Sequence, residues 1–229
     1  MSPDRVADSW PDGLPRFRPQ RKRLDGRYRF LTPEGDLVPG VTTVLSATDP
    51  LEKKWRLADW RRRELAAGRD PNRHARRGTW LHRQVEQALT KPGFEPEASE
   101  FQPFWESIRP ALGWLRRSLL LESLVWHPQG YAGTLDCLAI CDRGRLLLLD
   151  WKSAEAEKPD AWLENYRLQL GAYLPAVEWV YRDWGLRVDA AALWTALPGQ
   201  PAQRVEYDRD AIAPFTATFL DRLAQYRGL

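Results

Sequence analysis

The fold is decided by a stretch that reads Gly133-Thr134-Leu135-Asp136, then Asp142-Arg143-Gly144, then Asp150-Trp151-Lys152. An Asp-Arg-Gly turn between two alternating segments predicts a β-hairpin. Pairing its strands about the turn sets Asp136 opposite Asp150 and leaves Lys152 on the face of Asp150, roughly 7 Å along the strand. Like charges directly across a ladder are destabilising. Lys152 would neutralise the pair in part, but a divalent cation fits it better, so the hairpin predicts a metal site.

The pattern on either side of the hairpin predicts helices first and strands afterwards. Short strands are expected over 27–45, including Val41–Leu45, and a basic helix is expected from Asp49-Pro50 to near Gly68. Further helices are expected over 74–90, 97–118, 160–182 and 209–226, and further strands over 119–127, 131–141, 145–151, 188–196 and 202–207. This order favours an α/β fold (α+β mixed), in which a mixed central β-sheet is flanked by helices. Leu146–Asp150, apolar on both faces, is expected to be its buried central strand.

Length and composition bound the class of protein. The 229 residues fit an extended or mobile segment over 1–26 and a single domain over 27–229, with N-terminal strands and a helical basic region over 27–118. No apolar run reaches the length of a membrane helix, and Asp4, Asp8 and Asp12 argue against a secretory signal, so we expect a cytoplasmic protein. Two cysteines, Cys137 and Cys141, are too few for a structural zinc or iron–sulfur site.

Positive charge is segregated along the chain. Residues 53–83 hold eleven Lys or Arg against three acids, a net of +8, and residues 14–30 hold seven against one, a net of +6. Such a field favours a polyanionic partner, although a solvated helix face in an arginine-rich chain would look the same. Trp55, Trp60 and Trp80 lie among the arginines and are candidates for stacking on unpaired bases. Tryptophans in periodic apolar segments are instead expected in the core: Trp114, Trp126, Trp162, Trp179 and Trp194.

The hairpin residues have the chemistry of phosphodiester hydrolysis. That reaction needs a polarised phosphate, an activated water and a stabilised leaving oxygen, which carboxylate-held divalent ions supply. Asp136 and Asp150 are the natural ligands, and the carbonyl of Trp151 is a further one. Lys152 would orient the water or stabilise charge on the phosphate, supported by Ser153. The ordinary alternative is an exposed ion pair, but charges rarely end an apolar strand without a use.

Two pairs of polar residues at i,i+4 spacing are further candidates. Gln169 and Tyr173 share one face of the helix that follows the hairpin, where an amide and a hydroxyl can bond phosphate or sugar oxygens. His82 and Glu86 share a face of an earlier helix, and the neutral imidazole of His82 is a possible metal ligand. Taken alone, the first pair would be a half-buried helix face, and His82 would be a buried core imidazole.

Together these motifs resemble a known family. His82, Gly133-Thr134-Leu135-Asp136, Asp150-Trp151-Lys152-Ser153, Gln169 and Tyr173 resemble in order and spacing the RecB-type branch of the PD-(D/E)XK nuclease superfamily. Val41–Leu45 with Lys54-Trp55, and Arg77-Gly78-Thr79-Trp80-Leu81-His82, resemble more narrowly the nucleases of the mitochondrial genome maintenance exonuclease type and their bacterial and phage relatives. The resemblance covers roughly residues 28–175 and implies a restriction-endonuclease-like core, with the catalytic core over 119–229.

The resemblance also implies roles for single residues. His82, Asp136 and Asp150, with the carbonyl of Trp151, would bind one or two Mg²⁺ or Mn²⁺ ions, and Lys152 would be catalytic. Gln169 and Tyr173 would hold the nucleic acid, with Arg76, Arg77, Trp80 and Ser153 completing the binding set and Glu86 in support. Members of this branch with an iron–sulfur cluster use four cysteines, so no cluster is expected here. The second acid is Asp where Glu is common, a replacement that the branch accepts.

The function expected from the sequence is that of a metal-dependent DNA exonuclease. It would prefer single-stranded DNA or DNA ends and would act in repair or recombination. A structure-specific endonuclease of the same fold, a nucleic-acid-binding module without catalysis and a scaffold without a nucleic-acid partner remain the alternatives.

Overall fold

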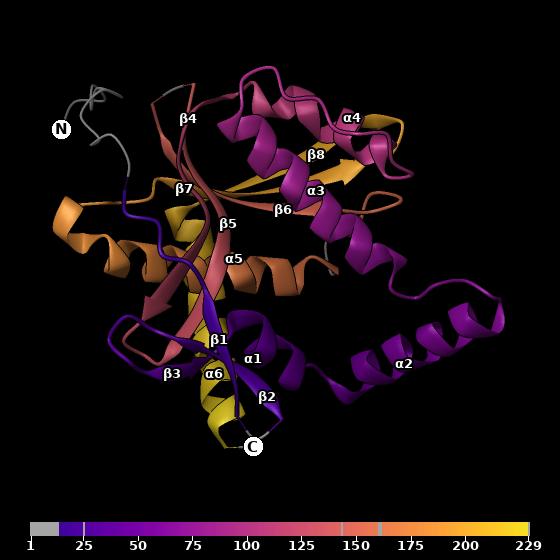
Figure 1. Cartoon of the computed structure of the whole chain (residues 1–229). Helices are drawn as coiled ribbons and strands as arrows, with labels where there is room; N and C mark the ends of the chain where they lie inside the picture. The colour runs from indigo at the N-terminus through magenta and orange to yellow at the C-terminus, as the bar shows by residue number, and fades with distance from the viewer. Residues whose placement is uncertain (1–13, 25, 143, 160–161, 229) are drawn as a thin grey trace.

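A computed structural model describes residues 14–24, 26–142, 144–159 and 162–228 (Figure 1). Its strands are β1 (Gln20–Leu24), β2 (Arg27–Leu31), β3 (Leu37–Pro39), β4 (Leu115–His127), β5 (Tyr131–Cys141), β6 (Leu146–Ser153), β7 (Ala190–Leu197) and β8 (Gln200–Asp208). Its helices are α1 (Val41–Ala47), α2 (Leu51–Ala66), α3 (Arg73–Thr90), α4 (Gln102–Leu112), α5 (Glu164–Val180) and α6 (Arg209–Arg227), with a short 3-10 turn, η2 (Arg182–Trp184).

Five strands form the central sheet in the order β4-β5-β6-β7-β8. Only the β6–β7 pair is parallel, so the mixed α/β fold expected from the sequence is confirmed. β6 is the middle strand, as its apolar character predicts. The β5–β6 register pairs Cys137 with Leu149 and Ile140 with Leu146, which is the register that the turn in the sequence predicts. The paired positions end at Cys137, one residue after Asp136.

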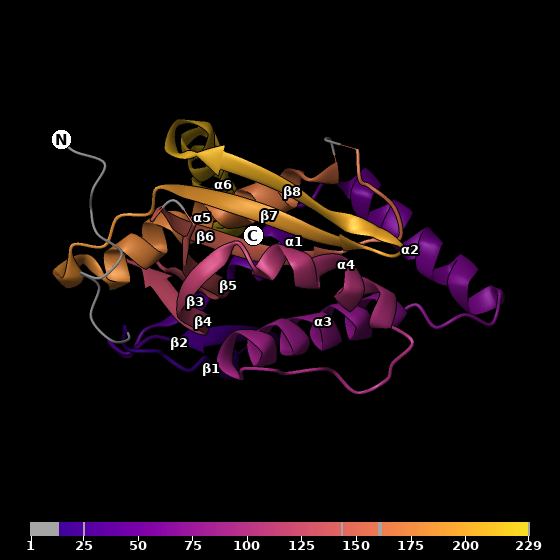
Figure 2. The ribbon, with the colours of Figure 1, turned by 90° about the horizontal axis from the view of Figure 1, so that it is seen from above.

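Two apolar clusters cover the two faces of this sheet. Figure 2 shows helices on both sides of it, α3 and α4 on one side and α5 and α6 on the other. Alternate residues of β6 divide between them, because Leu148 belongs to the first cluster and Leu149 to the second. The first cluster joins the sheet to α1, α5, α6 and the three-stranded sheet β1-β2-β3, and the second joins it to α3 and α4. Where α5 meets α6, a Cβ on Gly171 would lie 2.6 Å from the backbone N of Thr216, so the close approach of the two helices requires glycine.

The structure corrects three expectations from the sequence. Val41–Leu45 is not a strand but the start of α1, because burying Val41, Val44 and Leu45 at i,i+3,i+4 spacing outweighs the β-propensity of the run. The predicted helix 97–118 is shorter, since α4 ends at Leu112 and β4 begins at Leu115. Three of the tryptophans expected in the core are exposed, Trp114, Trp162 and Trp179.

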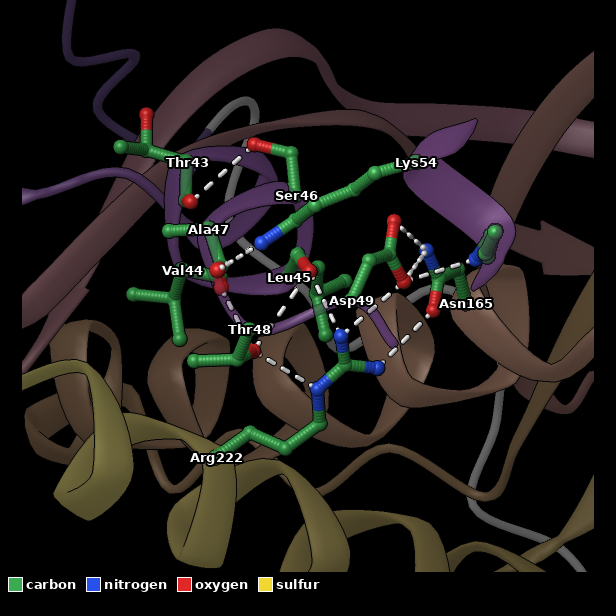
Figure 3. A network of polar contacts seen from close by, with 11 residues as sticks. Thr43, Val44, Leu45, Ser46, Ala47, Thr48, Asp49, Lys54, Asn165 and Arg222 are labelled. Atoms are coloured by element: carbon green, nitrogen blue, oxygen red, sulfur yellow. Dashed lines mark hydrogen bonds and ion pairs between the residues drawn. The ribbon is translucent and has the colours of Figure 1, made fainter. Parts of the chain in front are cut away.

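Helix α2 projects from the body of the molecule (Figure 1) and has no buried residue. A polar network secures its base (Figure 3). The guanidinium of Arg222 on α6 donates to the carbonyl of Leu45, to the hydroxyl of Thr48, to the carboxylate of Asp49 and to the amide oxygen of Asn165 on α5. Arg222 on α6 therefore joins the chain between α1 and α2 to helix α5.

Candidate metal centre

Helix α3 presents His82 to the central sheet. Leu81 and Val85 are fully buried in the second cluster and press one face of α3 onto the sheet, which leaves His82 at the rim of that contact. Nε2 of His82 lies 3.1 Å from the carbonyl oxygen of Trp151 on β6, and Nδ1 lies 3.2 Å from Oε1 of Glu122 on β4. A helix and two strands therefore meet at this imidazole.

Asp136 on β5 completes the cluster. Its Oδ1 lies 3.6 Å from Nδ1 of His82, and its Oδ2 accepts a hydrogen bond of 2.7 Å from the backbone N–H of Trp151. One ligand atom from each of His82, Glu122 and Asp136 lies within 4.8 Å of the others. The predicted members His82, Asp136 and the Trp151 carbonyl are thus gathered, together with a carboxylate that the sequence analysis did not single out.

Glu122 reaches the cluster through an irregular backbone. Its φ is +46°, a left-handed conformation that an L-residue with a Cβ adopts at a cost. Across from it, β5 changes the face that it presents, since Leu135 packs into the first cluster and Cys137 into the second although they are two residues apart. Glu122 and Asp136 lie between the paired positions Leu121↔Cys137 and Ser123↔Leu135. Both acids therefore sit where the regular sheet is interrupted.

Asp150 lies beside this cluster rather than within it. Its carboxylate forms an ion pair with the ammonium of Lys152, and it is 1% exposed. Oδ2 makes this ion pair, and Oδ1 has no partner among the residues that the structure describes. Burial raises the pKa of Asp150 to about 6 in spite of the nearby Lys152, and the charge of Asp136 raises it further. A buried acid with free lone pairs is a site that favours an added cation.

The electrostatics of His82 also indicate that this site favours a positive charge. Burial alone would lower the pKa of His82, but the charge of Asp136 and the hydrogen bond to Glu122 outweigh it and raise this pKa to about 9. Both ring nitrogens face acceptors, so the imidazole carries two protons in this arrangement. The pKa of Asp136 is raised by burial, against the lowering effect of His82 and Lys152. The positive charge of the His82 imidazolium therefore lies among two carboxylates and a carbonyl, an environment that favours a cation.

These residues fit a hard divalent cation. Two carboxylates, a backbone carbonyl and one imidazole nitrogen match the ligands of Mg²⁺ or Mn²⁺, and Oδ1 of Asp150 offers a further donor. The described residues contain two free cysteines, one of them fully buried, and neither belongs to the cluster. The donor set is therefore one of oxygen and nitrogen.

The predicted pair on α5 lies behind the acids. Tyr173 is buried, and a Cβ on Gly133 would lie 2.5 Å from its ring, so the glycine of the Gly133–Asp136 motif makes room for the tyrosine. The side-chain amide of Gln169 donates to the hydroxyl of Tyr173 at 3.4 Å. Burial raises the pKa of Tyr173 well above its usual value, and the charge of Asp136 adds to this. The hydroxyl therefore remains a neutral donor next to the carboxylates.

Other predicted residues support the end of β6. Arg77 is buried, and its guanidinium donates to the hydroxyl of Ser153 at 3.0 Å and to its carbonyl at 3.1 Å, and pairs with Glu155. Arg77 and Ser153 thus bind one another and hold the strand just after Lys152.

The remaining predicted residues lie further from the cluster. Arg76 is exposed and paired with Asp70, and Trp80 is half-buried against Phe101. Glu86 forms an ion pair of 2.8 Å with Arg16 from the segment before β1. This pair lies at the wall of a hollow of about 790 Å³ that also borders His82 and Glu122.

Glu122 is the functional candidate that sequence reasoning missed. It stands alone in a strand pattern, with no motif around it, and only the interruption of the β4–β5 ladder turns it toward His82. Once the register of β4 is known, Glu122 could have been found as an acid that lies across from the motif aspartate, Asp136, on the paired strand.

The sequence is similar to several curated proteins, each named mitochondrial genome maintenance exonuclease 1. The mouse protein (Mus musculus) is 30% identical over 203 residues, which are 82% of this chain and 59% of the relative. The frog protein (Xenopus tropicalis) is 29% identical over 205 residues, 83% of this chain and 57% of the relative. The human protein (Homo sapiens) is 27% identical over 240 residues, 97% of this chain and 68% of the relative. The chain thus spans less than two thirds of the mouse and frog relatives. No protein-family model matches it.

Solved structures give a weaker likeness. LHK-Exo in complex with dAMP is 17% identical, with a TM-score of 0.35 that covers 83% of this chain and 88% of that chain. The structure of LHK-Exo as an alkaline exonuclease from Laribacter hongkongensis has a TM-score of 0.33 at 16% identity, covering 82% of this chain and 87% of that chain. The fold described above rests on the topology of this chain alone.

Proposed function

We propose that this protein is a metal-dependent deoxyribonuclease of the RecB-type branch of the PD-(D/E)XK nucleases. The observation that carries the proposal is the cluster of His82, Glu122 and Asp136, with the carbonyl of Trp151 at the other ring nitrogen of His82 and the buried Asp150–Lys152 pair beside it. The relatives named as exonucleases support the same class of reaction. The chain would hydrolyse phosphodiester bonds with Mg²⁺ or Mn²⁺ as its cofactor.

Each residue of the centre has a role in that reaction. The cation would be held by Asp136, Glu122, His82 and the Trp151 carbonyl, with Asp150 beside it, and when bound it polarises the phosphate and activates a water. Lys152 keeps its positive charge, because Asp150 and Asp136 raise its pKa in spite of burial. Its ammonium would orient the attacking water or stabilise negative charge on the phosphate. Tyr173 would donate a hydrogen bond to a phosphate oxygen from behind the acids.

We infer that the substrate is single-stranded DNA or a DNA end, cleaved as an exonuclease in repair or recombination. Helix α2 supports this substrate, because it is basic, projects from the body and exposes 66% of Trp55. An exposed tryptophan among cations can stack on an unpaired base, which a duplex does not offer. The names of the relatives support an exonuclease over an endonuclease.

Three substrates test the proposal in one assay. End-labelled single-stranded DNA, linear duplex and a closed single-stranded circle are incubated with Mg²⁺ or Mn²⁺, with and without a chelator. We expect loss of the linear single strand alone, and no loss in the chelator. Cleavage of the circle would show an endonuclease of the same fold.

Lys152→Ala tests the mechanism. We expect at least a hundredfold loss of rate, because a group that stabilises charge in the transition state contributes about 3 kcal/mol or more. Lys158→Ala is the matched control. The ammonium groups of Lys152 and Lys158 both lie over the ring of Tyr166, but among the described residues Lys158 makes no ion pair with the acids of the centre. Full activity of Lys152→Ala would rule the mechanism out.

A further inference from the structure

The hollow next to the metal centre has a wall that none of the predicted site residues supplies. Its volume is about 790 Å³, and one side is formed by α3 with His82 and Arg83. The opposite side comes from the segment that leads into β1, with Arg16 and Arg18, and from β1 itself, with Arg21. The ion pair between Arg16 and Glu86 links the two sides. The centre therefore opens into a cleft between a helix and the N-terminal strand.

Three of the four arginines at this cleft have no counter-ion among the residues that the structure describes, because only Arg16 forms an ion pair and Arg21 lies over the ring of Phe30. Arg18 and Arg83 are exposed and make no ion pair or hydrogen bond with any other residue that the structure describes. By contrast, the two acids at the cleft are already engaged, Glu86 by Arg16 and Glu122 by His82. The charge of the cleft that is left unpaired is therefore positive.

The floor of the cleft carries an unsatisfied polar atom. The hydroxyl of Thr134, two residues before Asp136 on β5, is buried at its oxygen and has no hydrogen-bond partner within the described part of the chain. Buried hydroxyls in folded proteins are nearly always bonded. A ligand oxygen in the cleft would satisfy it, and phosphate and sugar oxygens both accept such a bond.

We propose that this cleft holds the phosphate backbone of one nucleic-acid strand next to the scissile bond, with one phosphate on Arg18 and another on Arg83. The inference rests on the proposed function, which it deepens by assigning a second binding wall to the N-terminal strand. Positive charge continues from this wall, because β1 exposes Arg21, Lys22 and Arg23 along its whole length. The hydroxyl of Thr134 bonds the backbone between the two arginines and the metal centre.

The salt dependence of binding tests the cleft directly. Affinity for a 30-nucleotide single strand is measured in a chelating buffer from 50 to 400 mM salt, for the whole chain and for Arg18→Gln/Arg83→Gln. Each lost phosphate contact lowers the slope of log affinity against log salt by about 0.7, so the double variant should lose about 1.4. That slope corresponds to an affinity loss of roughly tenfold at 200 mM salt and roughly sixtyfold at 50 mM.

Two matched variants separate position from charge. Arg182→Gln/Arg187→Gln removes the same two charges from η2 and the loop after it, and it should leave the slope unchanged. Arg18→Lys/Arg83→Lys keeps the charges and should retain most of the slope. Both cleft arginines are exposed, so we expect the three double variants to unfold at temperatures close to that of the wild type.

The outcomes distinguish the cleft from the proposed function. If the slopes of the cleft variant and the control fall equally, or if the whole chain does not bind the strand, the inference is overturned. If the whole chain with Mg²⁺ or Mn²⁺ hydrolyses neither DNA nor bis-p-nitrophenyl phosphate, the proposed function fails, whatever the slopes are. If the protein is active but the cleft variant and the control variant have equal slopes, only the inference about the cleft is refuted.

Discussion

The left-handed backbone at Glu122 allows the metal centre and the fold to be tested against one another. Glu122→Gly and Glu122→Ala both remove the carboxylate that faces His82, but only the first removes the Cβ that makes a φ of +46° costly. A left-handed residue with a Cβ costs about 1–2 kcal/mol. Glycine in a strand loses about 0.5–1 kcal/mol to alanine through its greater freedom in the unfolded chain. We therefore expect Glu122→Gly to be more stable than Glu122→Ala by about 1 kcal/mol.

Thermal unfolding measures both effects. For a chain of this size about 1 kcal/mol corresponds to about 2–4 °C, so in a chelator the glycine variant should melt that much above the alanine variant. A metal ion at a hundred times its Kd stabilises a protein by about 2.7 kcal/mol, or roughly 5–10 °C. Wild type should show such a rise with Mn²⁺, and both variants should lose most of it because a ligand is missing.

Two results would refute this reasoning. An alanine variant as stable as the glycine variant would show that position 122 is not left-handed. An equal rise in melting temperature for wild type and both variants would show that Glu122 is not a ligand. Activity should fall in both variants together, since neither retains the carboxylate.

Three further perturbations follow from the same structure. Metal-free Asp150→Asn should melt at a higher temperature than metal-free wild type, because burial raises the pKa of Asp150 and makes its charged form unfavourable. With Mn²⁺ the variant should instead melt at a lower temperature than wild type. A lower melting temperature of the variant in the chelator would contradict the burial argument. Gly133→Ala should cost about 1–3 kcal/mol and lower kcat, because the new Cβ would displace Tyr173; unchanged kcat with lost stability would leave Tyr173 a purely structural role. Arg222→Met should cost about 2–4 kcal/mol at pH 7, since its hydrogen bonds to Asp49 and Asn165 are lost. Burial alone would raise the pKa of Asp49, but Lys53, Asn165 and Arg222 hold it below its usual value, so their stabilisation is present above about pH 4 and is lost as the pH falls through the folded pKa. The difference in melting temperature between wild type and Arg222→Met should therefore narrow on acidification, and a constant difference from pH 7 to pH 3 would contradict this.

Local signals were enough for much of the architecture. The Asp-Arg-Gly turn and its alternating flanks predict the β5–β6 register, and the apolar run of β6 predicts its central position, because hairpin register and strand burial depend on neighbours in sequence. The basic helix after Pro50 is likewise predicted, and α2 begins at Leu51. The motif acids and Lys152 are identified at the same level, as residues that a strand end does not need for packing.

The other features of the fold and of the candidate site depend on contacts between segments that are distant in sequence. Val41–Leu45 becomes helical because α5, α6 and β5 bury one side of it, which no local propensity records. Glu122 contacts His82 only because the β4–β5 ladder is interrupted beside Asp136. Arg18 and Arg83 line one cleft only because the segment before β1 is held to α3 by the ion pair between Arg16 and Glu86. The sequence alone thus predicts the chemistry proposed for the hairpin, whereas the proposed ligand set and the walls around it arise from packing between segments 40 to 70 residues apart.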